Sequence, residues 1–345
     1  MKIQKESLTF DDVLLIPKYS EIPSRLSECI STETDLTKNI KIPTPFISSN
    51  MDSITEIDMA LAMNTNGGVG IFHRFYRDYN TLLTQITLYA KTKREMPVTS
   101  IGINQFNRIV DLIKIRDALG ISGLIPVRID VAHANNKDVL EFIKQIKTNF
   151  KGELSVIGGN VCTAEGTMNL INVDVDAVCV GIGGGSVCST RIVTGCGVPQ
   201  LSAVIDCYEV ARHYNIPIIS DGGIRYPSDA VKALAAGAST VMMGREFASC
   251  KEAPHYGFYR GQSSAEFQKD YGIERDGIAP EGVAIKVQKI STVKEVMKYY
   301  LGGLRSALSY VGAKNIKELQ SKAEFTKCSH ASLNESHPHG QTRSH

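Results

Sequence analysis

A regular alternation of short apolar runs with amphipathic stretches is the feature that most limits how this 345-residue sequence can fold. Each run leads into a polar loop and then into helical periodicity, as in residues 138–146, where apolar residues recur every three or four positions. Such alternation predicts an α/β protein with a parallel sheet, and eight runs fit a closed (β/α)8 (TIM) barrel better than an open sheet. The runs are Thr44–Ser49, Gly68–Phe72, Val98–Ile103, Gly123–Ile129, Leu154–Gly158, Ala177–Gly181, Pro217–Ser220 and Thr240–Met243.

The barrel is expected to form a single domain over residues 1–325, with residues 1–40 as an N-terminal arm. In residues 246–288, apolar residues do not recur with a regular helical or strand spacing. This is typical of a flap that closes on substrate or of an ordinary surface insertion, and we favour the flap. The polar, histidine-containing segment 326–345 predicts a disordered tail. Helices are expected at Asn107–Leu119, Asn136–Phe150, Thr163–Ile171, Ala203–His213, Pro227–Ala236 and Val293–Leu301.

Charge and cysteine usage exclude several classes of protein. The net charge is +2 and no basic run interleaves with aromatic residues, so we expect no nucleic-acid partner. No segment has the length of a membrane span or signal peptide, so a cytoplasmic protein is expected. The eight cysteines include no Cys-x-x-Cys pair, which argues against a zinc site and a disulfide framework.

The loop Gly181–Arg191, which follows the sixth run, carries the clearest chemical signal. Its three consecutive glycines allow close backbone approach to a ligand, and successive amides with the Ser186 hydroxyl suit an anion. Cys188 stands beyond them, beside the Thr190 hydroxyl and the Arg191 charge, as covalent catalysis requires. On the loop alone, a small buried packing cysteine is the more common interpretation, and the rest of the sequence changes that balance.

The loops after the seventh and eighth runs predict a phosphate site, because barrels of this kind often bind phosphate there. Asp221, Gly222 and Gly223 follow the seventh run, while Gly244 and Arg245 follow the eighth. Glycine amides can hold phosphate oxygens, whereas the aspartate suits a ribose diol, which donates two hydrogen bonds to a carboxylate. Together these residues predict a nucleoside monophosphate with its base directed toward the cysteine of the glycine loop.

Eight ordered motifs, spread from about Leu8 to about Leu319, identify a family. They are Leu8–Pro17, Asn50–Asp52, Gly67–Gly70, Gly159–Val161, Gly181–Arg191, Asp221–Ile224, Pro280–Gly282 and Leu301–Gly312. Through them the chain resembles the family of inosine monophosphate (IMP) dehydrogenase and guanosine monophosphate (GMP) reductase. The resemblance implies that Cys188 attacks C2 of the purine. The dehydrogenase then passes hydride to NAD and hydrolyses the thioimidate, whereas the reductase expels ammonia and takes hydride from NADPH.

Three features favour the NADPH-dependent GMP reductase within this family. The sequence has no room after Ile103 for the regulatory CBS modules that dehydrogenases usually carry, and Ile129–His133 resembles the reductase version of its loop. Between Gly261 and Glu281 there is no Arg-Tyr pair, which dehydrogenases use to activate water. The alternatives are a dehydrogenase without the insert, a non-catalytic purine-nucleotide sensor and, more weakly, a flavin-dependent barrel.

The resemblance also implies roles for individual residues. Thr190 and Glu281 would handle protons beside Cys188, although a threonine that caps a helix and an ordinary surface carboxylate are the alternatives. Arg25 and Arg74 would suit a ribose phosphate, which favours NADPH, and a homotetramer is expected. The implied substrate residues are Asn160, Ser186, Asp221, Gly222, Gly223, Gly244, Arg245, Gly261, Gln262, Ser263 and Gly282. The implied cofactor residues are Ser24, Arg25, Arg74, Asp130, Val131, Ala132, Ser306 and Ser309, and a potassium-type ion would lie near Gly183, Gly185, Cys188 and Arg191.

Overall fold

The computed structural model describes residues 6–254, 257–273 and 276–338, and its centre is an eight-stranded parallel sheet. Every strand of this sheet overlaps one of the eight predicted runs, which confirms the strand assignment. The strands are β4 (Phe46–Ser48), β5 (Val69–Gly70), β6 (Thr99–Ile101), β7 (Ile125–Ile129), β8 (Leu154–Val161), β9 (Ala177–Val180), β10 (Ile218–Asp221) and β11 (Thr240–Met243).

The sheet closes on itself. Its order is β5-β4-β11-β10-β9-β8-β7-β6, and a parallel bridge between Phe72 and Thr99 joins the two outer strands. The Phe72 amide donates to the Val98 carbonyl at 2.9 Å, and the Ser100 amide donates back to the Phe72 carbonyl at 2.8 Å. Closure leaves no open strand edge, so the (β/α)8 barrel is confirmed.

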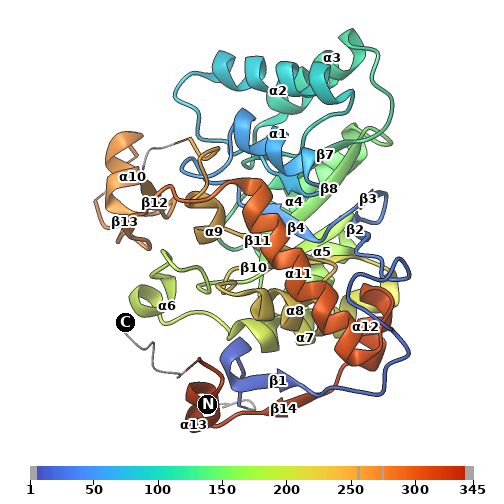
Figure 1. The fold of residues 1–345 in the computed structure, drawn as a ribbon. Helices are drawn as coiled ribbons and strands as arrows, with labels where there is room; N and C mark the ends of the chain where they lie inside the picture. Colours follow the sequence, from blue (N-terminus) through green and yellow to red (C-terminus); the bar gives the residue numbers. More distant parts are fainter. Residues whose placement is uncertain (1–5, 255–256, 274–275, 339–345) are drawn as a thin grey trace.

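Helices surround the barrel, and the five expected within it are confirmed to within a few residues (Figure 1). Capping side chains explain where several of these helices begin. Asp78, Asn136 and Thr163 accept hydrogen bonds from backbone amides in the first turns of α2, α4 and α5, respectively. The helices on the barrel are α1 (Ile57–Thr65), α2 (Tyr79–Lys93), α3 (Phe106–Ala118), α4 (Lys137–Asn149), α5 (Ala164–Asn172), α7 (Gln200–Ala211) and α8 (Pro227–Ala235). The short η2 (Arg212–Tyr214) extends α7.

The closing helix is longer than the expected Val293–Leu301. Helix α11 spans Val293–Val311 and continues through Gly302 and Gly303. A Cβ on Gly303 would lie 2.5 Å from Cβ of Pro227, whereas a Cβ on Gly302 would meet nothing within 4 Å. Gly303 therefore allows α11 to pack closely against the start of α8, and this contact explains a glycine inside a helix.

This contact predicts opposite effects of alanine at the two glycines. Gly303→Ala should lower the free energy of unfolding by about 1–3 kcal/mol, because the added methyl group overlaps Pro227. Gly302→Ala should raise it by up to about 1 kcal/mol, because alanine favours the helix and the site is open. Urea unfolding of both variants checks the pair, and equal shifts of the same sign would contradict the packing argument.

Residues 246–288 contain an antiparallel hairpin and a short helix. The hairpin pairs β12 (Phe258–Arg260) with β13 (Ala284–Lys286), and α10 (Ala265–Asp270) lies between them in sequence. These elements stand together at one side of the barrel in Figure 1, and α9 (Arg245–Ala248) connects them to β11. Their motion as a flap stays a prediction.

The segment after residue 325 departs from the expected disordered tail. Strand β14 (Phe325–Lys327) pairs antiparallel with β1 (Val13–Leu15), and α13 (His330–Glu335) follows. Backbone pairing with the arm orders this polar segment, so the prediction is wrong up to residue 338, while residues 339–345 lie outside the described part.

The remaining elements are η1 (Phe10–Asp12), β2 (Thr34–Thr37), β3 (Ile40–Ile42), α6 (Thr190–Thr194) and α12 (Ile316–Lys322). None of the helices in the described ranges is long and apolar enough to cross a membrane.

Candidate active site

The carboxyl ends of the barrel strands open into a cavity of about 410 Å³. Its wall combines loops from both halves of the barrel with residues of the segment 246–288. Most predicted site residues meet here: Arg74, Asp130, Val131, Ala132, Asn160, Gly183, Gly185, Cys188, Thr190, Asp221, Gly222, Gln262, Ser263 and Glu281. The barrel thus brings together residues spread over more than two hundred positions of the sequence.

Cys188 is exposed at the lip of this cavity. Its Sγ lies 3.1 Å from Oγ1 of Thr190, within hydrogen-bond distance. The N-cap of α6 is Ser189, which makes no side-chain capping bond, so the threonine hydroxyl faces the thiol and does not cap the helix. A hydroxyl at this distance can exchange a proton with the cysteine or with a group bound to it.

Glu281 reaches the same place from the other end of the flap segment. The Ser189 amide donates to the Glu281 carbonyl at 2.9 Å, and the Val283 amide donates to the Val187 carbonyl at 2.9 Å. These two bonds lay the flap backbone antiparallel to the cysteine loop. Glu281 is therefore one of the residues that line the cavity, and it does not belong to an unrelated surface loop.

The buried cysteines differ from Cys188 in their environment. Burial raises the pKa of Cys179, Cys207 and Cys250 to about 12, so these thiols stay protonated near neutral pH. Cys188 is exposed and stands beside a hydroxyl. Among the cysteines that line this cavity or lie beneath it, it is the one accessible to a substrate.

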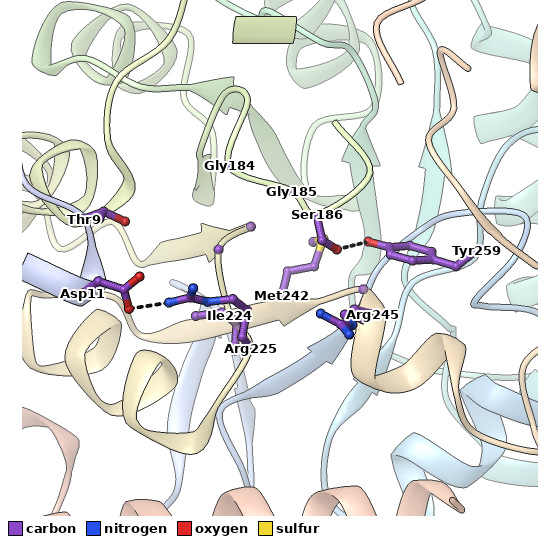
Figure 2. Close-up of a pocket in the computed structure, with 13 residues that line it drawn as sticks. Thr9, Asp11, Gly184, Gly185, Ser186, Ile224, Arg225, Met242, Arg245 and Tyr259 are labelled. Carbon is purple, nitrogen blue, oxygen red and sulfur yellow. Dashed lines mark hydrogen bonds and ion pairs between the residues drawn. The ribbon is translucent and has the colours of Figure 1, made fainter. Parts of the chain in front are cut away.

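A second hollow of about 200 Å³ lies beneath the glycine loop and matches the predicted phosphate site (Figure 2). The predicted Ser186, Gly222, Gly223, Gly244 and Arg245 all line it. Figure 2 shows Ser186 and Tyr259 on one side of this hollow and the ion pair of Asp11 with Arg225 on the other. Thr9, Asp11, Arg225, Met242 and Tyr259 also line it, although no sequence pattern assigned them to the site.

The chemistry of this hollow suits a phosphate. Burial raises the pKa of Tyr259 to about 12, so its hydroxyl keeps its proton and can donate. Two arginines, Arg225 and Arg245, border the hollow, and Arg225 neutralises the nearby Asp11. An anion here would meet hydroxyl donors, glycine amides and a positive charge.

Asp221 lies at the end of β10 and lines the larger cavity, and the next residue, Gly222, lines both hollows. The Asn160 amide donates to Oδ2 of Asp221 at 2.8 Å and to the Gly181 carbonyl at 2.8 Å. Gly181 has a φ of 146°, and a Cβ there would lie 2.0 Å from the Asp221 carbonyl oxygen, so the close approach of the two loops requires glycine. The aspartate side chain is thereby fixed at the cavity edge, where a ribose between base and phosphate would lie.

The predicted cofactor residues divide into two groups. Asp130, Val131 and Ala132 line the cavity, and Arg74 Nε donates to Oδ2 of Asp130 at 3.0 Å. An apolar wall beside a carboxylate fits a flat, carboxamide-bearing ring such as nicotinamide. In contrast, Arg25 donates to Oγ of Ser306 at 3.2 Å, and both line a separate hollow beside α11 and α13. The structure therefore does not bring Ser24, Arg25, Ser306 and Ser309 to the Cys188 cavity of the same chain.

The residues expected near a potassium-type ion lie in a loop where two carbonyls already accept hydrogen bonds. Arg191 Nε donates to the Ile182 carbonyl at 3.0 Å, and its Nη2 donates to the Val198 carbonyl, so a guanidinium already lies against this loop. The Gly185 carbonyl accepts the Cys188 amide at 3.0 Å. No cluster of three or more His, Cys, Asp or Glu side chains able to hold a metal occurs in the described ranges. The monovalent-ion site stays a prediction.

The flap segment is fastened to the barrel by Arg260. Its guanidinium pairs with the buried Asp52, which follows β4, and with Asp270 of α10. The predicted Gln262 donates to the Asn50 carbonyl, and Gly261 and Gly282 have their backbones close to Val187. The Arg260 ion pairs therefore hold Gly261, Gln262, Ser263 and Gly282 over the mouth of the cavity.

Comparison with known proteins agrees with this geometry. The family model described as the IMP dehydrogenase / GMP reductase domain matches residues 7–339. A protein named inosine-5'-monophosphate dehydrogenase from Borreliella burgdorferi is 37% identical over 407 aligned positions, which cover 98% of each chain. Proteins of the same name from Cryptosporidium parvum and Aquifex aeolicus are 35% and 34% identical, with 97% of this chain covered and 95% and 96% of theirs. The chain belongs to the IMP dehydrogenase / GMP reductase family.

Proposed function

We propose that this protein is an IMP dehydrogenase, which oxidises IMP to xanthosine monophosphate with NAD. The observation that carries the proposal is that relatives aligned over nearly the whole chain bear this name. The alignment with the Borreliella protein covers 407 positions, more than the 345 residues here, so that relative contains segments that this chain lacks. This difference in length still favours GMP reductase, but the identity over nearly the whole chain outweighs it.

The first half of the reaction uses Cys188. Its sulfur, as thiolate, adds to C2 of the purine while the hydrogen on C2 leaves with its electron pair. Asp130, Val131 and Ala132 would hold the nicotinamide ring of NAD, which would supply the hydride acceptor. Asp221 would hold the ribose hydroxyls and Ser186 the phosphate, so that the base extends toward the thiol. The product of this step is a thioimidate between Cys188 and C2.

The second half requires water and a proton acceptor. Water adds to C2, the C2–S bond breaks, and the sulfur leaves as thiolate, which releases xanthosine monophosphate. The Thr190 hydroxyl, 3.1 Å from the sulfur, would take the proton from water and pass it toward Glu281. Overall, one IMP, one NAD and one water give xanthosine monophosphate, NADH and a proton.

NAD suits this cavity better than NADPH. Arg74 was expected to receive a ribose phosphate, but its guanidinium is engaged by Asp130 at 3.0 Å and stacks on Phe75, with Cζ 4.1 Å from the ring centroid. Arg25, the other expected partner, lines a different hollow. Neither arginine offers an uncommitted charge beside the Cys188 cavity for an extra phosphate.

GMP reductase remains the second candidate, because of a specific feature of the flap. Tyr271 is preceded by Asp270, not by arginine, and Asp270 is paired with Arg260. Arg275, which is the arginine between Gly261 and Glu281 in the sequence, lies outside the described residues. A flap without an Arg-Tyr pair favours a reaction that needs no hydrolysis, and Thr190 with Glu281 would then give a proton to departing ammonia.

A pair of assays separates the candidates. The purified protein is mixed with IMP and NAD in one cuvette and with GMP and NADPH in another, and the nicotinamide absorbance is followed. A rise in the first cuvette, with xanthosine monophosphate identified by chromatography, supports the dehydrogenase. A fall confined to the second cuvette overturns it in favour of the reductase. If neither absorbance changes, both proposals fail and the sensor alternative gains support.

A further inference from the structure

A buried arginine beneath the cavity is unexplained by the roles assigned so far. Arg128 lies on β7, is 3% exposed and contributes to the cavity wall. Its Nη1 donates to Oδ1 of Asp130 at 2.8 Å and also to the Asn50 side chain. Its Nη2 donates to Oδ1 of Asn160 at 2.8 Å and lies 3.6 Å from Oδ2 of Asp221. One guanidinium therefore joins the carboxyl-terminal ends of β8 and β10 to the loops after β4 and β7.

These contacts connect the two sides of the proposed site. Asp221 is the proposed ribose ligand, while Asp130 belongs to the proposed nicotinamide wall. Asn160 accepts from Arg128 and donates to Asp221, so it transmits the position of the guanidinium to that carboxylate. Moving Arg128 would therefore shift Asp221 directly, through the ion pair, and indirectly, through the amide.

The charge on Arg128 is permanent. Burial alone would lower its pKa, but the groups around it, with the carboxylates of Asp130 and Asp221 among them, raise it above its ordinary value. The neighbouring Cys179, 3.8 Å from Nη2, has a pKa of about 12 and stays neutral near neutral pH. Arg128 is thus a fixed cation between the two carboxylates and cannot itself act as a base.

Stability of the fold does not account for this arrangement. Well-packed apolar residues stabilise a barrel core as well as a buried ion pair does, because burying charges costs desolvation energy. Within the described residues, Nε of Arg128 is buried and has no hydrogen-bond partner, which adds a further cost. A residue that is costly for folding and central to the cavity wall points to a role in binding.

We propose that Arg128 is a positioning residue that holds Asp221 aligned for the ribose hydroxyls, and so determines the preference for ribonucleotides over 2′-deoxyribonucleotides. The inference rests on the proposed function insofar as the ligand is a purine nucleoside monophosphate. Without the cation, Asp221 loses an ion pair, and Asn160, which donates to Asp221, loses the hydrogen bond that fixes its own side chain. The 2′-hydroxyl then adds little binding free energy, so nucleotides with ribose and with 2′-deoxyribose bind with similar affinity.

The test compares binding of IMP and 2′-deoxy-IMP by calorimetry, without dinucleotide. Wild-type protein should bind the ribonucleotide about 10–100-fold more tightly, as expected for a hydrogen bond to a charged acceptor. Arg128→Met should reduce this ratio to within about threefold of unity, and Arg128→Lys should restore part of it. The matched control is Arg116→Met, which removes an arginine paired with Asp117 and Glu153 away from the cavity and should keep the wild-type ratio.

The outcomes separate this inference from the proposed function. A folded Arg128→Met protein that keeps the wild-type ratio, or that loses affinity equally for both nucleotides, overturns the positioning role alone. If the Met variant does not fold by circular dichroism, Arg128→Lys decides, and an unchanged ratio there overturns the inference. Wild-type protein that binds neither nucleotide overturns both proposals. This test measures nucleotide binding and not turnover. It therefore stays valid if neither cuvette assay shows a change in absorbance.

Discussion

Replacing Cys188 with alanine is expected to lower kcat/KM at least about 10⁴-fold, whichever nucleotide is the substrate. The sulfur provides the bond to C2 in both candidate reactions, and no other thiol lines the cavity within the described ranges. The variant should still bind nucleotide, because its phosphate and ribose contacts come from other loops. Steady-state kinetics and calorimetry on the same preparation measure the two effects.

The control for this variant is Cys196→Ala. Cys196 is also exposed and follows the same loop, but its thiol contacts only the Thr194 carbonyl among the hydrogen bonds of the structure. Its loss should change kcat/KM by less than about threefold, as for an ordinary surface residue. Equal losses in both variants would show that the loop, and not the sulfur of Cys188, is what activity requires.

Glu281→Gln is expected to lower kcat by about 10²–10⁴, with a much smaller effect on KM. The amide keeps the shape of the side chain but cannot accept the proton passed from Thr190. Because the two residues act in sequence, Thr190→Val should be similarly slow, and the double variant should be little slower than either single variant. Stopped-flow measurements should show that the hydride step is retained, with the loss confined to hydrolysis.

Glu266→Gln provides the matched control, since Glu266 is an exposed glutamate on α10 of the same flap segment. It should leave kcat unchanged to within about twofold. Multiplicative losses for Thr190→Val and Glu281→Gln in the double variant would contradict a shared proton path. They would assign independent roles to the two side chains.

The sequence was sufficient to predict the barrel because its signal is local. The runs at Thr44–Ser49 and Thr240–Met243 became β4 and β11, which are neighbours in the closed sheet although nearly two hundred residues apart. Their pairing follows from the fold class, not from the residues themselves. The polar loops after the strands then had to meet at one end of the barrel, which is why Cys188, Asp221 and Asn160 could be grouped in advance.

Contacts that depend on distant packing could not be predicted in this way. Arg128 lies inside an apolar run of the sequence. A charged residue within such a run, two positions before Asp130, is the one sequence signal that pointed to a role in the site. Pairing of the 187–189 backbone with 281–283 depends on how a long segment folds back. The same is true of β14, whose polar sequence indicated disorder until β1 supplied the partner. Arg25 and Ser306 were assigned by resemblance alone, and their place in three dimensions had no sequence signal.

The most direct measurement of the central claim is covalent labelling with a 2-halogenated inosine monophosphate. The thiolate of Cys188 would add to C2 and halide would leave, so the nucleotide would remain bound to sulfur and could be located by peptide mass spectrometry. The account predicts labelling of Cys188 at one nucleotide per chain, blocked by IMP, with the exposed Cys29 and Cys196 unlabelled. Label on those two cysteines with none on Cys188, or labelling that IMP does not block, would contradict it.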